Sequence, residues 1–149
     1  MFLQTVRFAS VLFTALSLAP ALAHLFELPN KIGLPRDEYV VAQKLYRGWQ
    51  FVGVAVVGAL LFTLLLAVLV RNDAEQFVPA VVALVSIVMT QVIFWTFTFP
   101  VNKRTVNWTR VPGDWERLRN RWEYSHAASA VCNRVALGAI AIAMIAPLS

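Results

Sequence analysis

The sequence predicts an all-α membrane protein, a four-transmembrane-helix bundle in a single domain (residues 1–149) with both termini on the same side of the bilayer. Composition is the first reason, because the chain is 59% hydrophobic and only 14% charged, whereas a soluble domain carries about 25% charged residues. The second reason is that the apolar residues form four runs, each matching the roughly 20 helical residues that cross a hydrocarbon core. An even number of spans returns the chain to its starting side.

The first span is predicted over residues 2–28. Pro20 is expected to kink it and Pro29 to end it, because proline lacks a backbone donor and distorts the preceding turn. The same segment allows a second interpretation, since Arg7, an apolar stretch and the triplet at 21–23 are also typical of a secretory signal with an A-x-A cleavage site. We expect the segment to be retained as a membrane span.

The second and third spans are predicted over residues 49–70 and 77–99. The second is stopped by the polar sequence at 71–73. Pro79 falls in the first turn of the third span, where a missing backbone donor costs little, and Pro100 is expected to close that span.

The fourth span is predicted over residues 119–148. Its helix starts in an amphipathic segment near Asp114, which follows a glycine and is a candidate N-cap, and it becomes apolar from Ala127. Cys132, the only cysteine, lies within this span. It cannot form an intrachain disulfide, and we interpret it as a small core residue.

The basic residues are divided unevenly between the two sides of the predicted bundle. Arg7 and Arg71 fall on the side of the termini, Arg134 falls inside the fourth span, and all other Lys and Arg belong to the connections at about 24–48 and 100–122. By the positive-inside rule, these connections face the cytoplasm of an inner membrane that the chain crosses as a multi-pass protein. The net charge of +5 then reflects topology, and we do not expect nucleic acid as a partner.

The large aromatic residues follow the same asymmetry. All five tryptophans and all three tyrosines lie on, or at the edge of, the side with the long connections. An interfacial belt normally forms at both membrane surfaces. The sequence therefore predicts a binding site at this end of the bundle as well as an anchor.

Two short motifs in this region carry the chemistry. The chain has only two histidines, and each has a glutamate three residues away, on the same helix face. His24 precedes Glu27, whereas His126 follows Glu123. The first span runs toward the cytoplasmic side and the fourth runs away from it. The reversed order therefore predicts that the histidines lie level with each other and the glutamates about one turn nearer the water.

These four side chains predict a metal site for a transition metal ion: iron, copper, manganese or zinc. Helical-bundle di-iron centres use four glutamates, and only two are present, so a single ion is expected. The two histidines would also suit the axial positions of a haem. A third interpretation is a hydrogen-bond network between helices in which a glutamate holds each histidine. The sequence leaves these three interpretations open.

Further polar residues are predicted at a similar depth. Tyr39, Gln43 and Tyr46 are spaced i, i+4 and i+7 on a helix entering the second span, Gln91 lies in the third span, and Asn102 follows it. They are candidates to orient the ligands or to bind substrate, and ordinary interfacial polar residues would show the same pattern. Together with Tyr46 and Asn102, Trp95 and Trp122 are the candidates to line a substrate pocket.

Arg134 is the most costly residue to place. It falls near mid-membrane, where an arginine costs roughly 2.5–3.5 kcal/mol to insert, and it follows Glu123 by three helical turns. Both residues are therefore expected on one face, and Arg134 is a candidate catalytic residue that stabilises an oxyanion. The alternative is that Arg134 has no catalytic role and extends its side chain to the membrane surface on the side of the termini.

The polar strings resemble a known family. H-L-F-E-L-P-N-K, Y-x-x-x-Q-x-x-Y, F-P-V-N-K and W-E-R-L-R-x-R-W-E-x-x-H are similar to a bacterial and fungal family of small four-span membrane proteins, largely of unknown function, that includes anthrone-oxygenase-like proteins. The resemblance covers nearly the whole chain. It implies four helices and, in some members, oxygen-dependent oxidation of a phenolic ring ketone to a quinone. The positions that match are His24, Glu27, Lys31, Tyr39, Gln43, Asn102, Trp122, Glu123 and His126.

The first functional hypothesis is an oxygen-dependent oxidoreductase that takes a hydrophobic aromatic or quinone-like substrate from the lipid. If the site holds no metal, a histidine or glutamate would act as general base and leave a carbanion that reacts with oxygen. The alternatives are a non-catalytic carrier or accessory subunit, and a haem-binding electron-transfer protein. The sequence leaves open whether the chain forms a homo-oligomer.

Overall fold

The computed structural model describes residues 1–146, and in this range the regular secondary structure is entirely helical. Four helical segments are long and apolar enough to cross a membrane, with mean hydropathies between 1.7 and 2.8. They are α1 (Phe2–Lys31), α3 (Val52–Leu69) with the 3-10 turn before it, α4 (Ala74–Ile93) with its continuation, and α6 (Trp115–Ile145). The four-helix fold class is confirmed.

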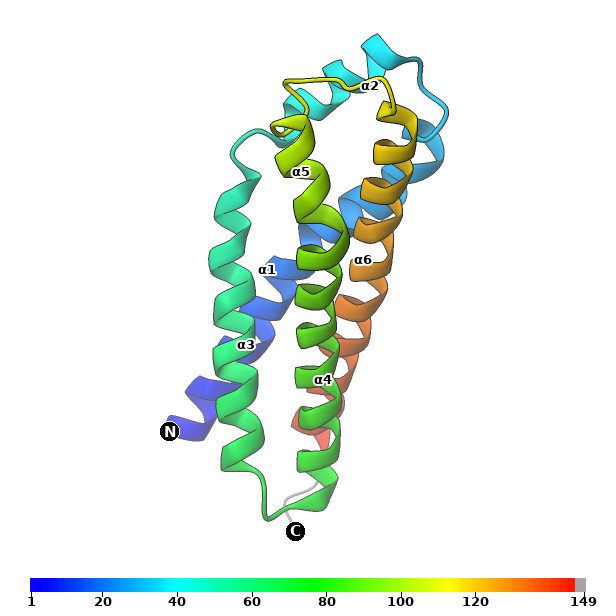
Figure 1. Ribbon diagram of the computed structural model, residues 1–149. Helices are drawn as coiled ribbons and strands as arrows, with labels where there is room; N and C mark the ends of the chain where they lie inside the picture. Colours follow the sequence, from blue (N-terminus) through cyan, green and yellow to red (C-terminus); the bar gives the residue numbers. More distant parts are fainter. Residues whose placement is uncertain (147–149) are drawn as a thin grey trace.

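The shorter elements lie at one end of the bundle. The first connection contains α2 (Arg36–Gln43) and the 3-10 turns η1 (Lys44–Tyr46) and η2 (Trp49–Phe51). The third span continues beyond α4 through the π-helical turn η3 (Phe94–Thr98) into α5 (Phe99–Thr105). Figure 1 shows α2 and α5 at the end opposite the start of α1, the end of α6 and the α3–α4 turn, so the first and last spans begin and end on the same side, as predicted.

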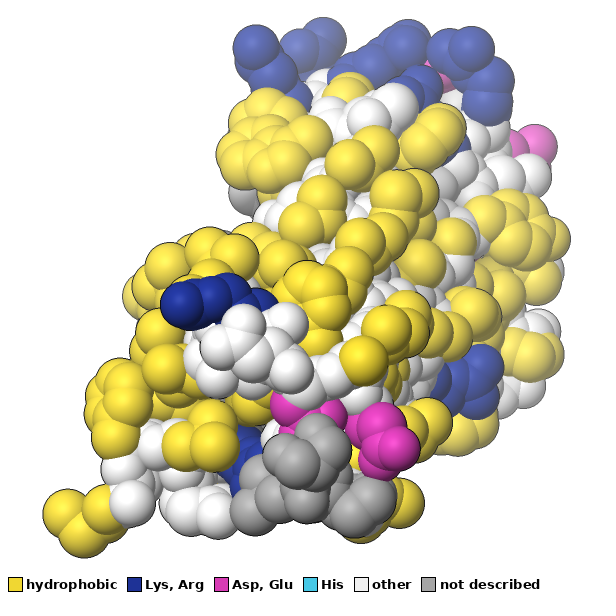
Figure 2. All heavy atoms as spheres, turned by 90° about the horizontal axis from the view of Figure 1, so that it is seen from below, with side chains coloured by type: hydrophobic (Ala, Val, Ile, Leu, Met, Phe, Trp, Pro, Cys, Tyr) yellow, Lys and Arg dark blue, Asp and Glu magenta, His cyan; other side chains and the backbone are white. Residues whose placement is uncertain are grey.

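The packing of the bundle is that of a protein in lipid. Its centre holds small or compact side chains such as Ala59, Ala83 and Ile87, whereas large residues such as Leu61 and Val85 point outward. Small residues let membrane helices approach closely, and lipid solvates the large apolar ones. In Figure 2 hydrophobic side chains cover most of the visible surface, and Lys and Arg gather at its far rim.

One glycine is required by this close packing. A Cβ placed on Gly58 of α3 would collide with the ring of Phe13 on α1. That ring cannot simply swing away, because it stacks on Phe62 with a centroid distance of 5.4 Å and an interplanar angle of 10°. The glycine therefore sets the distance between the first two spans.

Two proline predictions were wrong. The first helix does not stop before Pro29 but includes it and ends at Lys31, which adds the last turn of α1 to the bundle. The third span does not close at Pro100. In an α-helix, the carbonyl of Thr96 would accept the backbone N–H of residue 100, which proline lacks. Arg121 of α6 donates to that carbonyl instead, at 2.5 Å, and the helix continues after the π-helical turn.

Two aspartates stand at helix N-termini, and only one caps with its side chain. Asp73 accepts hydrogen bonds from the backbone N–H groups of Glu75 and Gln76, so the third span starts three residues earlier than predicted. Asp114 occupies the N-cap position of α6, but its carboxylate makes no cap hydrogen bond. It binds Arg104 and Arg117 instead.

A polar contact at the termini end ties α1 to α4. Arg7 of α1 is buried and donates a hydrogen bond to Gln76 of α4, whose side-chain amide in turn donates to Asp73 at 2.7 Å. Arg7 therefore belongs to the interior of the bundle, and α1 packs along both α3 and α6. Removal of residues 1–23 would delete most of this helix.

Candidate functional site

The structure brings the two histidines into direct contact. His24 of α1 and His126 of α6 have ring centroids 4.3 Å apart, with their planes tilted by 33°. The ring of Trp122 packs edge-on against both, at 4.9 Å from His24 and 4.2 Å from His126. The antiparallel arrangement of the two motifs therefore places the imidazoles at one depth, as their reversed order predicts.

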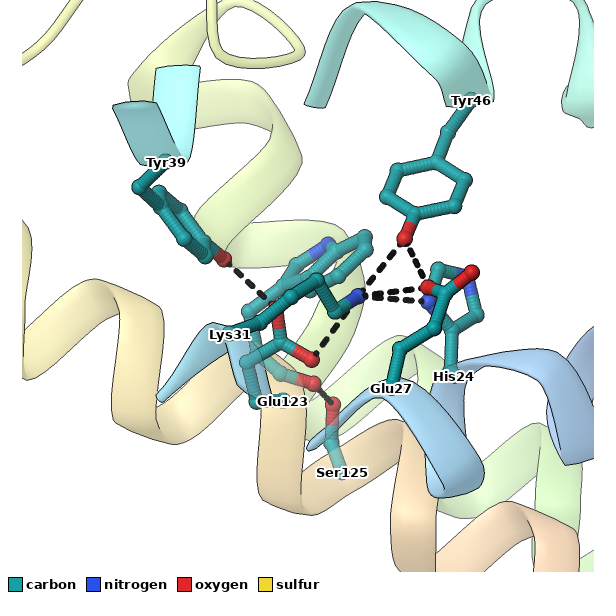
Figure 3. Close-up of polar contacts among 8 residues, drawn as sticks. His24, Glu27, Lys31, Tyr39, Tyr46, Glu123 and Ser125 are labelled. Atoms are coloured by element: carbon teal, nitrogen blue, oxygen red, sulfur yellow. Dashed lines mark hydrogen bonds and ion pairs between the residues drawn. The ribbon is translucent and has the colours of Figure 1, made fainter. Parts of the chain in front are cut away.

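The two glutamates meet at Lys31, the last residue of α1. Its ammonium lies 3.2 Å from Oε2 of Glu27 and 3.3 Å from Oε2 of Glu123. It also lies 3.3 Å from Nδ1 of His24 and donates to the hydroxyl of Tyr46 at 2.7 Å. Figure 3 shows the lysine side chain between the two carboxylates. The cation that joins the two His–Glu motifs is supplied by the chain itself.

Lys31 was missed as a central residue, although the sequence contains the signal for it. It follows Glu27 by four residues and His24 by seven, which on a helix places all three on one face. The prediction that α1 ends before Pro29 removed the lysine from that helix. Once the helix reaches Lys31, the three side chains line up.

Tyr39 anchors the carboxylate of Glu123 from the far side. Its hydroxyl donates to Oε1 at 3.0 Å, and its ring is fully buried edge-on against Trp108. The pKa of Tyr39 is raised far above its usual value, first by burial and then by the negative charge of Glu123. The tyrosine therefore stays a hydrogen-bond donor to the carboxylate.

Tyr46 closes the other side of the group. Its ring lies 4.4 Å from the ring of His24, and its hydroxyl accepts from Lys31 and donates to Glu27. Burial and the hydrogen bond to Glu27 raise its pKa well above the ordinary value. The predicted helical stripe is broken after Gln43, because the chain passes through η1 and then turns at Gly48, where φ is +90°.

Beside the histidine pair lies a cavity of about 790 Å³. All four spans and the two long connections line it. Its aromatic lining is Tyr46, Trp49, Phe94, Trp95, Trp108 and Trp122. Its polar lining includes Ser17, His24, Gln43, Thr90, Gln91, Asn102, His126, Ser129 and Asn133. A volume of this size and mixed lining is typical of small-molecule sites, which measure about 300–1,000 Å³.

The cavity reaches the outer surface of the bundle between the second and third spans. Val57 of α3 and Trp95 of η3 both line it and are 56% and 60% exposed. This surface faces the lipid in a membrane-spanning bundle. At the end with the long connections, the exposed residues Asn107 and Thr109 also line the cavity. A ligand in the cavity would therefore contact apolar residues toward the lipid and polar residues toward the end with the long connections.

Three buried side-chain nitrogens of residues that line the cavity have no hydrogen-bond partner among residues 1–146. They are Nε2 of His126, the amide nitrogen of Gln43 and Nε1 of Trp108. Buried polar groups are almost always hydrogen-bonded. A polar ligand in the cavity would supply hydrogen-bond partners for these nitrogens.

The predicted site residues thus separate into two groups. Gln43, Tyr46, Gln91, Trp95, Asn102 and Trp122 line the cavity together with both histidines. The indole N–H of Trp122 donates to Asn102 at 2.8 Å, which fixes one wall. Glu27, Tyr39 and Glu123 stand behind that wall, around Lys31. Ser17, Ser129 and Asn133 were missed, although Asn133 follows His126 by two helical turns and could have been found from that spacing.

The structure does not bring Arg134 into the cavity. Glu123 and Arg134 are three turns apart, as the sequence shows, but the buried face of α6 drifts around the helix through Ala130 and Asn133 to Ile140. The face that is covered at Glu123 is therefore open at Arg134, whose side chain is exposed. Arg134 is therefore not among the residues that line the cavity.

The residues do not fit the predicted metal ion. In the described part of the chain, no three His, Cys, Asp or Glu side chains are grouped to hold one. The two carboxylates instead bind the Lys31 ammonium, and an ion placed there would have to displace a buried positive charge. A haem between the histidines does not fit either, because rings with centroids 4.3 Å apart are in contact and leave no space for a porphyrin.

Comparison with known proteins gave no relative from which a function could be carried over. No family model, no curated protein and no solved structure matches the chain. The function must therefore be argued from the site.

Proposed function

We propose that this membrane protein takes a flat aromatic ketone from the bilayer into its cavity and catalyses oxidation of that ketone by O₂ without a metal. The observation that carries the proposal is the buried, unpartnered Nε2 of His126 at the wall of an aromatic-lined cavity. An imidazole in this position is suited to take a proton from a bound substrate. The resemblance of the polar strings to the anthrone-oxygenase-like family adds support for the substrate class.

The shape of the cavity supports a planar, lipid-soluble ligand. Indole rings stack on aromatic faces, and Trp49, Trp95 and Trp122 all line the cavity. The exposed rims at Val57 and Trp95 offer a path from the lipid. A molecule entering there would reach the histidines without crossing water.

The hydrogen bonds around His24 define its role beside His126. An ammonium only donates, so the contact with Lys31 makes Nδ1 of His24 the acceptor and leaves its proton on Nε2. His24 is then a neutral ring packed against His126. We assign His24 a positioning role and His126 the role of general base.

The reaction balances without a bound cofactor. His126 takes one proton from a methylene that lies between two aromatic rings, and the electron pair passes to the ring ketone as an enolate. Gln43, whose amide nitrogen is free at the cavity wall, would donate a hydrogen bond to that oxygen. The carbanion gives one electron to O₂, the two radicals form a C–O bond, and His126 returns its proton to the peroxide. Loss of water from the hydroperoxide leaves a quinone, so one O₂ becomes one carbonyl oxygen and one water.

The test uses purified protein in detergent, anthrone as substrate, and simultaneous records of O₂ uptake and quinone absorbance. The wild-type rate should exceed the protein-free rate and survive a metal chelator. His126→Gln should lower the rate by about 10²–10⁴-fold, the range of general base catalysis. Tyr124→Phe, an exposed tyrosine of α6, is the matched control and should leave the rate unchanged.

Other outcomes would reject the proposal. An unchanged rate in His126→Gln would exclude this base, and loss of activity on chelation would require a metal. Anthrone binding that quenches tryptophan fluorescence without any turnover would instead indicate a carrier or an accessory subunit.

A further inference from the structure

We propose that a second site, on the outer face of α5 and α6, binds the phosphate of an anionic phospholipid headgroup. A separate cavity of about 260 Å³ lies there, lined by Pro100, Val101, Arg104, Arg117, Leu118 and Arg121. Three arginines thus surround an apolar floor. Basic pockets between transmembrane helices on the cytoplasmic side are the pattern that binds anionic headgroups.

Each of the three guanidinium groups has a hydrogen-bond partner in the protein. Arg104 and Arg117 each donate to Asp114 at 2.8 Å, and Arg121 donates to the carbonyl of Thr96 at 2.5 Å. The hydrogen bond from Arg117 is the main cause that lowers the pKa of Asp114, which favours the charged carboxylate that both arginines bind.

The donors that remain are enough for an anion. A guanidinium has five N–H donors, and for each of the three arginines the structure pairs one side-chain nitrogen with an acceptor in residues 1–146. Three arginines around one aspartate leave a net charge of +2 at the cavity. Arginine binds phosphate through paired N–H donors, which makes phosphate the matching ligand.

The surroundings favour a phosphate that is attached to a lipid. The guanidinium of Arg121 lies over the ring of Phe97, 5.4 Å from its centroid. Phe97 and Phe99 are 45% and 40% exposed on the outer surface of the same span, where acyl chains would lie. A headgroup held by the arginines would therefore have its chains beside these rings.

The experiment measures lipid binding to the full-length protein in neutral detergent by native mass spectrometry. The probes are dioleoylphosphatidylglycerol, dioleoylphosphatidylcholine and inorganic phosphate. We expect one phosphatidylglycerol to bind at least tenfold more tightly than phosphatidylcholine, and binding should weaken as salt is raised. Arg104→Gln with Arg121→Gln should lower the affinity by about tenfold or more, since each removes a charge-assisted hydrogen bond.

The control variant removes two positive charges from the same end of the bundle, but outside the cavity. Arg36→Gln with Arg110→Gln changes two exposed arginines outside the cavity, and this variant should bind as the wild type does. An equal loss of phosphatidylglycerol affinity in both double variants would show that only the general surface charge matters, and it would overturn the proposed site. Equal binding of the two lipids would also overturn it, and saturation by inorganic phosphate at the same concentrations would assign the site to free phosphate. Anthrone oxidation is not needed for any of these readings.

Discussion

The ammonium of Lys31 lies 3.3 Å from Oε2 of Glu123, and this ion pair joins the first helix to the last. Both side chains are buried, the glutamate completely. A buried ion pair adds little compared with apolar packing, but removal of one partner strands the other charge away from water. The pair is therefore a sensitive point of the bundle.

The first prediction concerns this pair. Lys31→Met should destabilise the folded protein by about 3–5 kcal/mol, because the buried carboxyl group of Glu123 loses its counterion. The measurement is reversible unfolding in mixed micelles with increasing denaturing detergent. The double variant Lys31→Met with Glu123→Leu should recover most of the loss. A single variant as stable as the wild type would show that the ammonium does not hold the two helices together.

The second prediction concerns alkaline pH. In the unfolded chain a tyrosine ionises near pH 10, but the pKa of Tyr39 in the folded protein is raised, chiefly by burial and then by Glu123. A folded pKa above the unfolded one gives stability that is complete below pH 10 and is lost as the pH rises further. The free energy of unfolding should therefore fall between about pH 10 and pH 11.5.

The variant Tyr39→Phe isolates this contribution. It should be less stable than the wild type at pH 8, because Glu123 loses a hydrogen-bond donor. Its stability should then fall less steeply above pH 10. Parallel pH profiles of the two proteins would rule out Tyr39 as the source of the alkaline loss.

The third prediction concerns the contact between α1 and α3. Gly58→Ala should cost about 1–3 kcal/mol, the usual range for overpacking, because the new methyl group meets the Phe13 ring. Gly138→Ala on α6 is the matched control, since a Cβ there has nothing within 4 Å. The control should be neutral or stabilised by roughly 0.5–1 kcal/mol through helix propensity. Thermal aggregation in detergent, compared for both variants, would check the difference, and equal midpoints would contradict the close approach.

The sequence was most informative where one property repeats over many residues. Four apolar runs predict the bundle, and their even number predicts that the first span starts and the last span ends on the same side; the structure agrees with both predictions. The level placement of the two histidines also followed from spacing, because reversed motifs on antiparallel helices bring both histidines to one depth when the glutamates are level. These inferences need helix geometry alone.

The features that were mispredicted depend on neighbours that spacing does not reveal. Pro100 does not end its helix, because the chain passes this proline through the π-helical turn η3, and Arg121 of another helix donates to the carbonyl of Thr96. Arg134 lies on the same face of α6 as Glu123. Other helices cover that face at Glu123, but three turns further along the face is exposed. Lys31 lies a few residues beyond the predicted end of the first helix. Because the helix continues to Lys31, the two carboxylates bind its ammonium group, where a metal ion was predicted.

The last prediction concerns orientation. Lys and Arg are concentrated in the two connections at the α2 end, whereas Arg7 at the other end is buried against Gln76. The positive-inside rule therefore places the α2 end in the cytoplasm and the termini outside an inner membrane. In a Cys132→Ser background, Asp37→Cys in α2 should react with a membrane-impermeant maleimide only after cells are lysed. Asn72→Cys, in the exposed α3–α4 turn, should react with the same maleimide in unlysed cells whose outer envelope has been permeabilised and whose inner membrane is intact. The reverse labelling pattern would invert the bundle and place the lipid site and the Lys31 group on the outer face.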